Sequence, residues 1–322
     1  MQLSFLALSQ GKKTRSGTFL ETMDKVVPWA LLLRVIGEHY PDLGVGRPKT
    51  DLELLLRAFC LAQWFNLSDA ELEDAIHDRV SFQRFLRLDA FGRKVPDHTV
   101  FCRFRNFLHE KALSERLFAE VNGCLQSQGL LMREGTLVDA TLISAPGSTK
   151  NAGKSRDPEM KSTKKGNQWY FGMKAHVGVD VDSGLVHSLR FTSANIPDVN
   201  EMKNLLHGEE RLVCGDKGYA SGAFRVRCEE LGVEYAILEK KAAGESPAER
   251  LGREERNRLK SWIRAKVEHP FRVVKHLWGH RRTRYRGVDK NGSWLRWSFL
   301  LANLYLLRKK LLKQERPWGT HA

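Results

Sequence analysis

The hydrophobic pattern changes its period near residue 130, and this change constrains the fold more than any other feature. Residues 50–128 carry apolar side chains at the three-to-four residue spacing of helices that each bury one face. From Thr136 onward, short apolar runs are separated by turns rich in Gly and Asp. We therefore expect an all-helical region followed by an α/β domain with a mixed sheet.

Helix-start signals divide the first half of the chain. Residues 50–53 and 68–71 both have capping-box form, in which the first and fourth side chains bond reciprocally to backbone N–H groups. In a later helix, Val100, Phe104 and Phe107 are spaced for burial on one face. The expected helices lie at 26–40, 50–65, 82–86 and 114–128, with further helices that open at 68 and at 96.

The second half of the chain reads as strands and connecting helices. Residues 136–142 predict a buried strand, and residues 144–168, rich in Ser, Gly and Lys, predict a mobile basic loop. Residues 182–184 predict the turn of a hairpin between strands at 174–181 and 185–192. Further expected elements are a helix from 195–198 to about 206, strands at 211–215 and 235–238, a helix at 223–231, an exposed charged segment at 240–260 and a buried helix at 294–307.

The charge balance points to a polyanionic partner. The chain of 322 residues has a formal net charge of +15, so nucleic acid is the first candidate, although membrane-surface proteins and ribosomal factors share this balance. The apolar run Trp294–Leu307 is too short to span a bilayer, which takes about 20 residues, so no membrane association is expected. Five widely spaced cysteines without a CxxC pair, and no signal-peptide pattern, favour a reducing cytoplasm.

Two aspartates lie where strands are expected. Asp139 interrupts an apolar strand, where a carboxylate is unfavourable unless it is paired, hydrogen-bonded or metal-bound. Asp216 ends the strand expected at 211–215, and ligands of α/β sheets bind at the carboxyl ends of strands. A salt bridge at Asp139 and a turn at Asp216 before Gly218 are the alternatives. Together, the two aspartates favour a site.

A third carboxylate is expected on a C-terminal helix. Arg264, Glu268 and Lys275 stand at i, i+4 and i+11, within roughly 40° of one another on a regular helix. The alternative is an ordinary surface face of ion pairs. Pro270 predicts a kink, because it removes a backbone donor and disfavours helical geometry at His269.

Three carboxylates on separate elements suit phosphodiester chemistry. Two Mg²⁺ ions about 3.5–4 Å apart can activate an oxygen nucleophile and stabilise the leaving oxygen. Mg²⁺ prefers oxygen ligands and takes few carboxylates, and Mn²⁺ is the expected substitute. We therefore expect Asp139, Asp216 and Glu268 to be catalytic and metal-binding, with Glu239 as the replacement if Glu268 faces solvent. Zinc-type His or Cys spacing and a phosphate-binding GxxxxGK[ST] loop are both missing from the sequence.

At these residues the sequence resembles the DDE transposases of bacterial insertion sequences, in particular the insertion-sequence-five group. Leu137–Thr141 resembles the strand of the first Asp, and Gly215–Tyr219 resembles the motif of the second. The third motif of the family runs Tyr, two residues, Arg, three residues, Glu, six residues, Lys. Arg264, Glu268 and Lys275 match that spacing, and Ser261 departs from the Tyr. Further matching pieces of the helical region are Gly46-Arg47-Pro48, Leu67-Ser68-Asp69, Asp78-Arg79 and Pro96-Asp97.

The resemblance implies an RNase-H-like catalytic core and a transposase that cleaves and joins DNA at the ends of its element. Its partners would be double-stranded DNA, both element ends and target, and a second copy in a homodimer or larger assembly near the nucleoid. A catalytically inactive DNA-binding derivative and a cellular nuclease of the same fold are the rival functions. The expected divisions are an N-terminal extension at 1–49, a helical DNA-binding or dimerisation domain at 50–130, the catalytic domain at 131–313 and a tail at 314–322.

Several basic and aromatic residues are candidates for DNA contact. Arg47 could enter a narrow minor groove, and Trp169 lies among lysines, where an aromatic ring can stack on bases. Arg281 and Arg282 open a dense basic run that suits backbone phosphates, as do Arg264 and Lys275. The alternatives are a linker at Arg47, core packing of Trp169 or Tyr170, and a solvated face at the arginine run.

Overall fold

The computed structural model describes residues 14–40, 50–88, 94–150, 153–314 and 318. The chain forms two compact units, one of Met1–Leu117 with Leu304–Ala322 and one of Phe118–Asn303. The boundary between them falls inside two helices, α8 (Leu113–Ser127) and α13 (Val288–Leu311).

The first unit is helical, as the sequence predicts. The capping box at Ser68 and Glu71 is confirmed, because each side chain accepts a hydrogen bond from the backbone of the other. The capping box expected at residues 50–53 is wrong: Asp51 caps this helix and accepts a bond from Leu54 N at 3.0 Å. The helices are α1 (Arg15–Val26), α2 (Trp29–Gly37), α3 (Leu52–Phe65), α4 (Asp69–Asp78), α5 (Val80–Phe85) and α7 (His98–Glu110). The helix expected at 26–40 is confirmed as α2, and α1 precedes it in a stretch for which no helix was predicted.

Helix α7 buries a different face from the one predicted. Of the three expected positions only Phe104 is buried, and Phe101 and Leu108 join it. Val100 and Phe107 are half-buried. Residues 101, 104 and 108 follow the i, i+3, i+7 spacing of a helix stripe as well as the predicted set does. Packing against neighbouring helices, which the sequence pattern does not specify, therefore decides the orientation.

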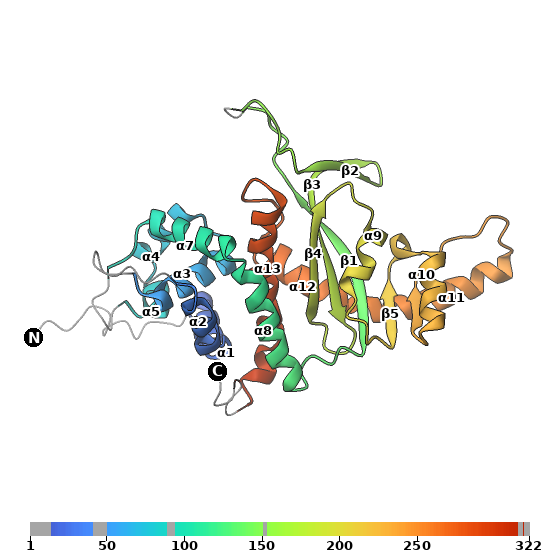
Figure 1. Cartoon of the computed structure of the whole chain (residues 1–322), viewed down its shortest axis with the longest axis horizontal. Coiled ribbons are helices and arrows are strands. Elements are labelled where there is room, and N and C mark those ends of the chain that lie inside the picture. Colours follow the sequence, from blue (N-terminus) through green and yellow to red (C-terminus); the bar gives the residue numbers. More distant parts are fainter. Residues whose placement is uncertain (1–13, 41–49, 89–93, 151–152, 315–317, 319–322) are drawn as a thin grey trace, which may run out of the picture. The chain divides into compact units, whose positions relative to one another are not determined.

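The second unit is built on a mixed sheet of six strands (Figure 1). The main path runs β2-β3-β1-β5-β6. Strand β4 lies off this path and pairs with residues 173–179 of β3, directly after the stretch 168–172 that pairs with β2. The pairs β1–β3, β2–β3 and β3–β4 are antiparallel, whereas β1–β5 and β5–β6 are parallel. The strands are β1 (Gly135–Ser144), β2 (Lys161–Lys165), β3 (Gln168–Asp180), β4 (Val186–Ser193), β5 (Leu212–Gly215) and β6 (Glu234–Ile237).

The hairpin predicted around residues 182–184 is confirmed by the antiparallel pairing of β3 with β4. Asp180 closes this turn by accepting hydrogen bonds from the backbone and the hydroxyl of Ser183. The expectation of one loop across residues 144–168 is wrong, because Lys161–Lys165 form β2 and pair with the first part of β3. Exposed lysines on β2 gave this edge strand no apolar alternation to recognise.

Different helices cover the two faces of the sheet (Figure 1). Val138 points to one face and packs with Met202 and Leu205 of α9 (Asp198–Leu205). The alternate residues of β1 point to the other face, because successive side chains of a strand alternate. Asp139 lies on that second face, where α11 (Pro247–Arg264) packs against β5. Helix α10 (Gly222–Glu230) packs beside β6.

The segment after α11 is helical but irregular. A 3₁₀ turn, η2 (Ala265–Val267), leads to one turn of α-helix, α12 (Glu268–Phe271), and then to a π-helical turn, η3 (Arg272–Leu277). The regular helix that the sequence pattern assumed for Arg264, Glu268 and Lys275 is therefore wrong, while the irregularity expected at Pro270 is present. Pro270 lacks the N–H of a regular helical ladder, and π turns accommodate such breaks.

The buried C-terminal helix is confirmed in α13, in which Trp297, Leu301 and Leu304 are among the buried residues. Within the described ranges, the helices are too short or too polar to cross a bilayer.

Candidate active site

Asp139 is a desolvated carboxylate with little compensation. Its side chain is 14% exposed, and Ala140 N donates its one hydrogen bond among the described residues, at 2.8 Å. Burial raises the pKa of Asp139 to about 6, and the nearby carboxylates of Asp216 and Glu268 contribute in the same direction. The salt bridge considered as the alternative is weak: Arg264 Nη2 lies 3.9 Å from Asp139 Oδ2, beyond hydrogen-bond distance. The carboxylate is thus available to a cation.

Asp216 lies next to Asp139 because of the strand register. In the parallel pair β1–β5 the register ends with Val138 opposite Gly215, so Asp139 and Asp216 each follow directly after this last pair, and the charge of Asp216 acts on Asp139. Neighbouring strands lie about 4.8 Å apart, and paired residues of parallel strands point to the same face. One Asp216 oxygen accepts a bond from Gly218 N at 2.8 Å and caps the turn η1 (Lys217–Tyr219). The turn considered as the alternative for Asp216 is therefore present, and its carboxylate remains a candidate for the site.

Arg264 lies between the carboxylates of Glu268 and Asp139. The Arg264 guanidinium, at the end of α11, lies 3.7 Å from Glu268 Oε1 and 3.9 Å from Asp139 Oδ2. These two carboxylate oxygens are therefore no farther apart than the sum of the two distances. The Glu268 side chain is 62% exposed, so it can still move. Arg264 and Glu268 meet as predicted although the helix between them is irregular.

Lys275 contacts the same strand further along. Its Nζ donates to Thr141 Oγ1 at 2.8 Å and to Leu142 O at 3.0 Å. Thr141 shares the sheet face of Asp139, so Lys275 lies beside the carboxylates. Burial lowers the pKa of Lys275, and the nearby cations Lys165 and Arg281 add to this effect. Sequence reasoning missed the role of Thr141, although its place two residues after Asp139 is the signal that identifies it.

Glu239, the alternative third carboxylate, is fully occupied. It follows β6 and accepts hydrogen bonds from Arg256 Nη2 and Lys260 Nζ, both at 2.9 Å. The Arg256 and Lys260 partners hold the pKa of Glu239 down to about 2. Both cations belong to α11. Glu239 therefore joins this helix to the end of β6 and is a structural carboxylate.

The donor chemistry of the three carboxylates fits a hard divalent cation. Asp139, Asp216 and Glu268 offer only oxygen ligands, and their mutual repulsion at Asp139 is what a cation would relieve. The described residues contain no group of three His, Cys, Asp or Glu side chains already spaced to hold a metal ion. Arg264 lies between two of the carboxylates and supplies positive charge there. The site thus offers the ligand types that a divalent cation prefers, but its carboxylates are not gathered at coordination distance.

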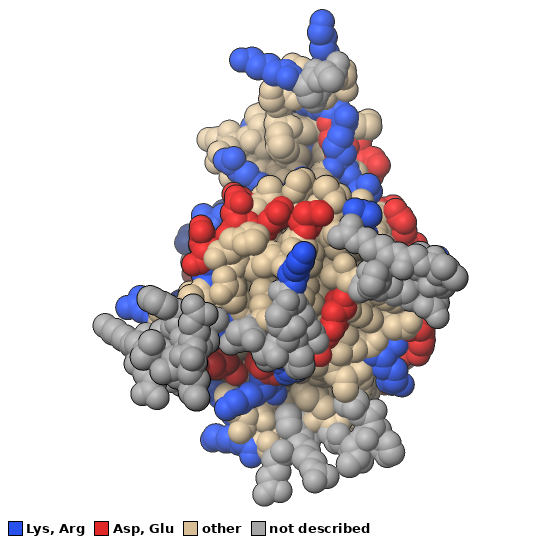
Figure 2. Space-filling view, turned by 90° about the vertical axis from the view of Figure 1, so that its left-hand side faces the viewer, with Lys and Arg blue, Asp and Glu red and all other residues tan. Residues whose placement is uncertain are grey.

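Cations surround the end of β1. Arg281 and Arg282 are exposed. The backbone of Arg282 forms an isolated β-bridge with Ser144, the last residue of β1. Arg281 also donates to the carbonyl of Lys275 at 3.0 Å, so the arginine run is tied to η3. On the face of the molecule shown in Figure 2, acidic and basic side chains are interspersed.

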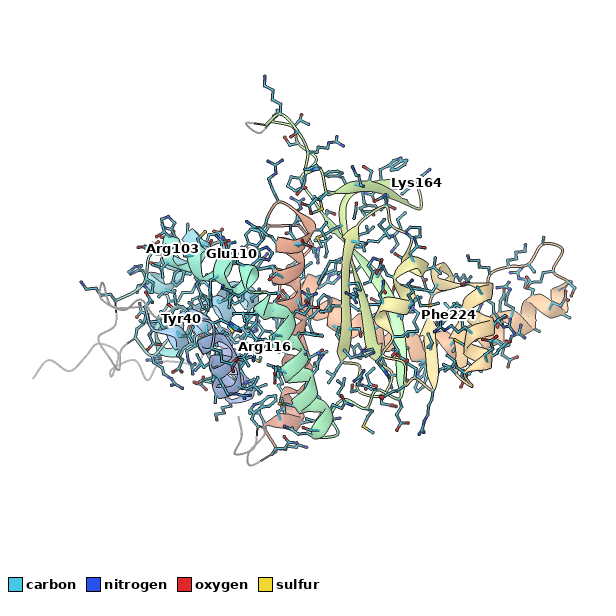
Figure 3. The ribbon with its side chains drawn as sticks, viewed as in Figure 1. Tyr40, Arg103, Glu110, Arg116, Lys164 and Phe224 are labelled. Atoms are coloured by element: carbon cyan, nitrogen blue, oxygen red, sulfur yellow. The ribbon has the colours of Figure 1, made fainter. Side chains whose placement is uncertain are left out.

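The aromatic candidate lies on the β2–β3 hairpin. Trp169 is 67% exposed, so the core-packing alternative is wrong for it, and Lys164 is its cross-strand neighbour (Figure 3). Tyr170 is half-buried. Arg47 lies outside the described residues, together with the break expected at 44–49.

Family models match both parts of the chain. A model described as "Transposase DDE domain" matches residues 131–304, which is more than half of the sequence. A second, described as "Transposase domain (DUF772)", matches residues 8–107. The chain therefore belongs to the family of DDE-domain transposases.

One solved structure matches this chain over most of its length. It is a crystal structure of the Mos1 strand transfer complex, 15% identical, in which the match covers 93% of this chain and 95% of that one. The TM-score is 0.28, so this likeness adds nothing to the assignment.

Proposed function

We propose that this transposase binds the ends of an insertion sequence and catalyses metal-dependent cleavage and transfer of DNA strands. The observation that carries the proposal is the state of Asp139. It is a half-buried carboxylate of raised pKa that follows the last β1–β5 pair, as Asp216 does, and the Arg264 guanidinium lies between it and Glu268. A structural carboxylate in this chain looks different, as the paired Glu239 demonstrates.

Asp139, Asp216 and Glu268 would hold the metal, most simply two Mg²⁺ ions with Mn²⁺ as a substitute. Bound there, the metal supplies a nucleophile activated at neutral pH and charge for the leaving oxygen. Arg264 offsets the carboxylate charge and is near enough to orient Glu268. Lys275, fixed against Thr141, presents a cation beside the carboxylates where a DNA phosphate can bind.

Further DNA contacts are proposed for four residues. Arg281 and Arg282 would bind backbone phosphates near the end of β1, and Trp169 would stack on an unpaired base. Arg47 is proposed for the minor groove on the sequence pattern alone. Because several cations act together, affinity would depend steeply on salt.

The catalytic core is proposed to be RNase-H-like, and the chain to belong to the insertion-sequence-five group. The strand order supports this fold: three antiparallel strands, β4-β3-β1, continue into the parallel β5 and β6, with the two aspartates on adjacent central strands. We retain the division into an extension (1–49), a helical DNA-binding or dimerisation domain (50–130), the catalytic domain (131–313) and a tail (314–322). Element ends and target DNA would be joined by a homodimer or larger assembly at the nucleoid.

A gel assay on labelled element ends tests the proposal. With Mg²⁺, the full chain should nick end DNA and join the freed 3′ hydroxyl to a target duplex. Binding without nicking would instead identify an inactive DNA-binding derivative. Nicking of any duplex without strand transfer would identify a nuclease.

A further inference from the structure

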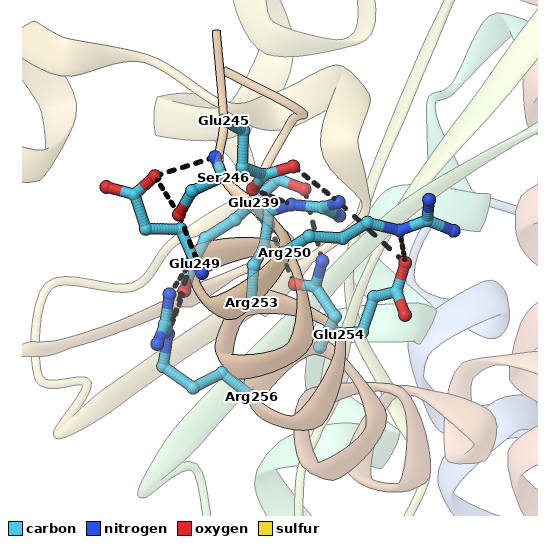
Figure 4. A network of polar contacts seen from close by, with 9 residues as sticks. Glu239, Glu245, Ser246, Glu249, Arg250, Arg253, Glu254 and Arg256 are labelled. Atoms are coloured by element: carbon cyan, nitrogen blue, oxygen red, sulfur yellow. Dashed lines mark hydrogen bonds and ion pairs between the residues drawn. The ribbon is translucent and has the colours of Figure 1, made fainter.

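Helix α11 has its polar and apolar faces reversed with respect to the sheet. Its inward face carries polar residues at the 4-3-4 spacing of one helix stripe. Lys260 donates to Ile237 O at 3.2 Å, and Asn257 donates to Glu239 O at 3.1 Å. Arg253 is paired with Glu245 in the network that holds the start of the helix (Figure 4). The residues of this inward stripe are Arg253, Asn257, Lys260 and Arg264.

The outward face carries the large apolar side chains. Leu251 is 70% exposed, Leu259 68% and Trp262 78%. At about 100° per residue, Leu251 and Trp262 lie about 20° apart around the helix, nearly opposite the polar stripe. A single exposed leucine is ordinary, but a leucine and a tryptophan exposed in line on one helix are a candidate interaction surface, with Leu259 about 70° from that line.

Two charged residues lie in line with this row and give it a two-fold pattern. The stripe reads Leu251, Glu255, Arg258, Trp262, with 4-3-4 spacing. Two copies of the helix, antiparallel about a two-fold axis, would place Leu251 opposite Trp262 and Glu255 opposite Arg258 of the other copy. Each residue thus meets a complement, as a closed two-fold interface requires. Among the described residues, Glu255 and Arg258 have no ion-pair partner within the chain.

We propose that this face of α11 binds a second copy of the chain in an antiparallel helix pair. The pattern favours a second copy over DNA, because Glu255 in the centre of the stripe would repel phosphate. An 18-residue helix is about 27 Å long, so one pair of such helices makes a small interface compared with the roughly 1,200–2,000 Å² that a standard interface buries. We therefore expect reversible association in the micromolar range. The inference does not depend on the proposed chemistry, since it concerns the protein without DNA or metal.

The test is sedimentation equilibrium of the full chain without DNA. The unaltered chain should form a reversible dimer. E255R and R258E should each weaken it at least about tenfold, since each creates two like-charge contacts per dimer. An equal mixture of E255R and R258E should regain the dimer, because the reversed charges then face each other across the interface. Charge pairing within one helix could not produce this recovery.

Trp262→Ser should also abolish the dimer, and Leu231→Ser, at an exposed leucine outside α11, should leave it unchanged. Circular dichroism of each variant checks that α11 remains folded. A chain that stays monomeric over the micromolar range overturns the proposal. So does a dimer that survives E255R and Trp262→Ser, or a mixture that does not recover. Loss of DNA binding with an intact dimer would assign the face to DNA instead.

Discussion

Two carboxylates beside α11, Glu239 and Asp139, differ in how closely cations of this helix pair with them. Near the middle of the helix, Glu239 accepts close hydrogen bonds from Arg256 and Lys260, and its pKa is held down to about 2. At the end of the helix, the α11 cation nearest to Asp139 is Arg264, at 3.9 Å, and burial raises the pKa of Asp139 to about 6. The same helix provides cations to both.

The two acids differ in how well their charge is paired. Paired carboxylates stabilise a fold, whereas a buried carboxylate that is left underpaired destabilises it until a ligand arrives. Strained electrostatics of this kind concentrate at functional sites. We therefore propose Asp139 as a metal ligand, and we do not propose Glu239 as a replacement for Glu268.

The largest effect should be on DNA cleavage. Asp139→Asn removes a carboxylate from the proposed metal site, so nicking of element ends should fall by at least about 100-fold. Asp216→Asn should do the same, and both variants should still bind end DNA. Glu239→Gln, the matched control, should change the nicking rate by less than about tenfold. Full nicking by Asp139→Asn, or its loss in Glu239→Gln, would reverse the comparison.

Thermal stability without metal should shift in opposite directions. At pH 7 the ionised Asp139 is disfavoured in the folded state, so Asp139→Asn should stabilise the metal-free chain, on the order of 2 kcal/mol. Glu239→Gln should destabilise it, because the folded state favours the ionised form. Differential scanning calorimetry with a chelator measures both melting temperatures. Shifts of the same sign would contradict the account.

The pH dependence follows from the same signs. The cost of ionising Asp139 is absent below its ordinary pKa of 3.8 and complete above about 6, so the gain in Asp139→Asn should vanish on acidification. The contribution of Glu239 is present above its ordinary value of 4.5 and disappears as the pH falls towards 2. Calorimetry of Asp139→Asn at pH 7, 5.5 and 4 separates the cost of ionising Asp139 from a packing effect, because a packing effect would not change with pH.

A smaller effect is expected at the arginine run. Neutralising Arg281 and Arg282 to Gln should flatten the salt dependence of DNA binding by about one unit per lost phosphate contact. Arg250 and Arg256, which are engaged with Glu254 and Glu239, provide the control pair for this change. Fluorescence anisotropy across a salt series gives the slopes. An unchanged slope would identify Arg281 and Arg282 as a solvated face.

Much of the fold could be predicted from local patterns. Cap residues located α4 and α7, and the apolar run located β1 with Asp139 inside it. The edge strand β2 could not be predicted, since its exposed lysines lack alternation. The orientation of α7 depends on tertiary packing, which the sequence pattern leaves open.

The candidate residues of the site could be chosen from the sequence, but their geometry could not. Spacing brought Arg264, Glu268 and Lys275 together on an ideal helix that the structure replaces with a 3₁₀ turn and a π turn. The contact of Lys275 with Thr141 depends on the register of a distant strand. The outward apolar row of α11 was hidden by its charged neighbours, because a charged segment reads as exposed whichever side faces the sheet.

The most direct measurement is an anomalous-scattering map of Mn²⁺ in a crystal of the chain with element-end DNA. The account predicts Mn²⁺ peaks against the Asp139 and Asp216 carboxylates, with Glu268 turned in as a ligand and Arg264 displaced from between the carboxylates. The Glu239 side chain should carry no peak and keep its bonds to Arg256 and Lys260. A peak at Glu239, or Glu268 pointing to solvent with metal and DNA both bound, would contradict the account.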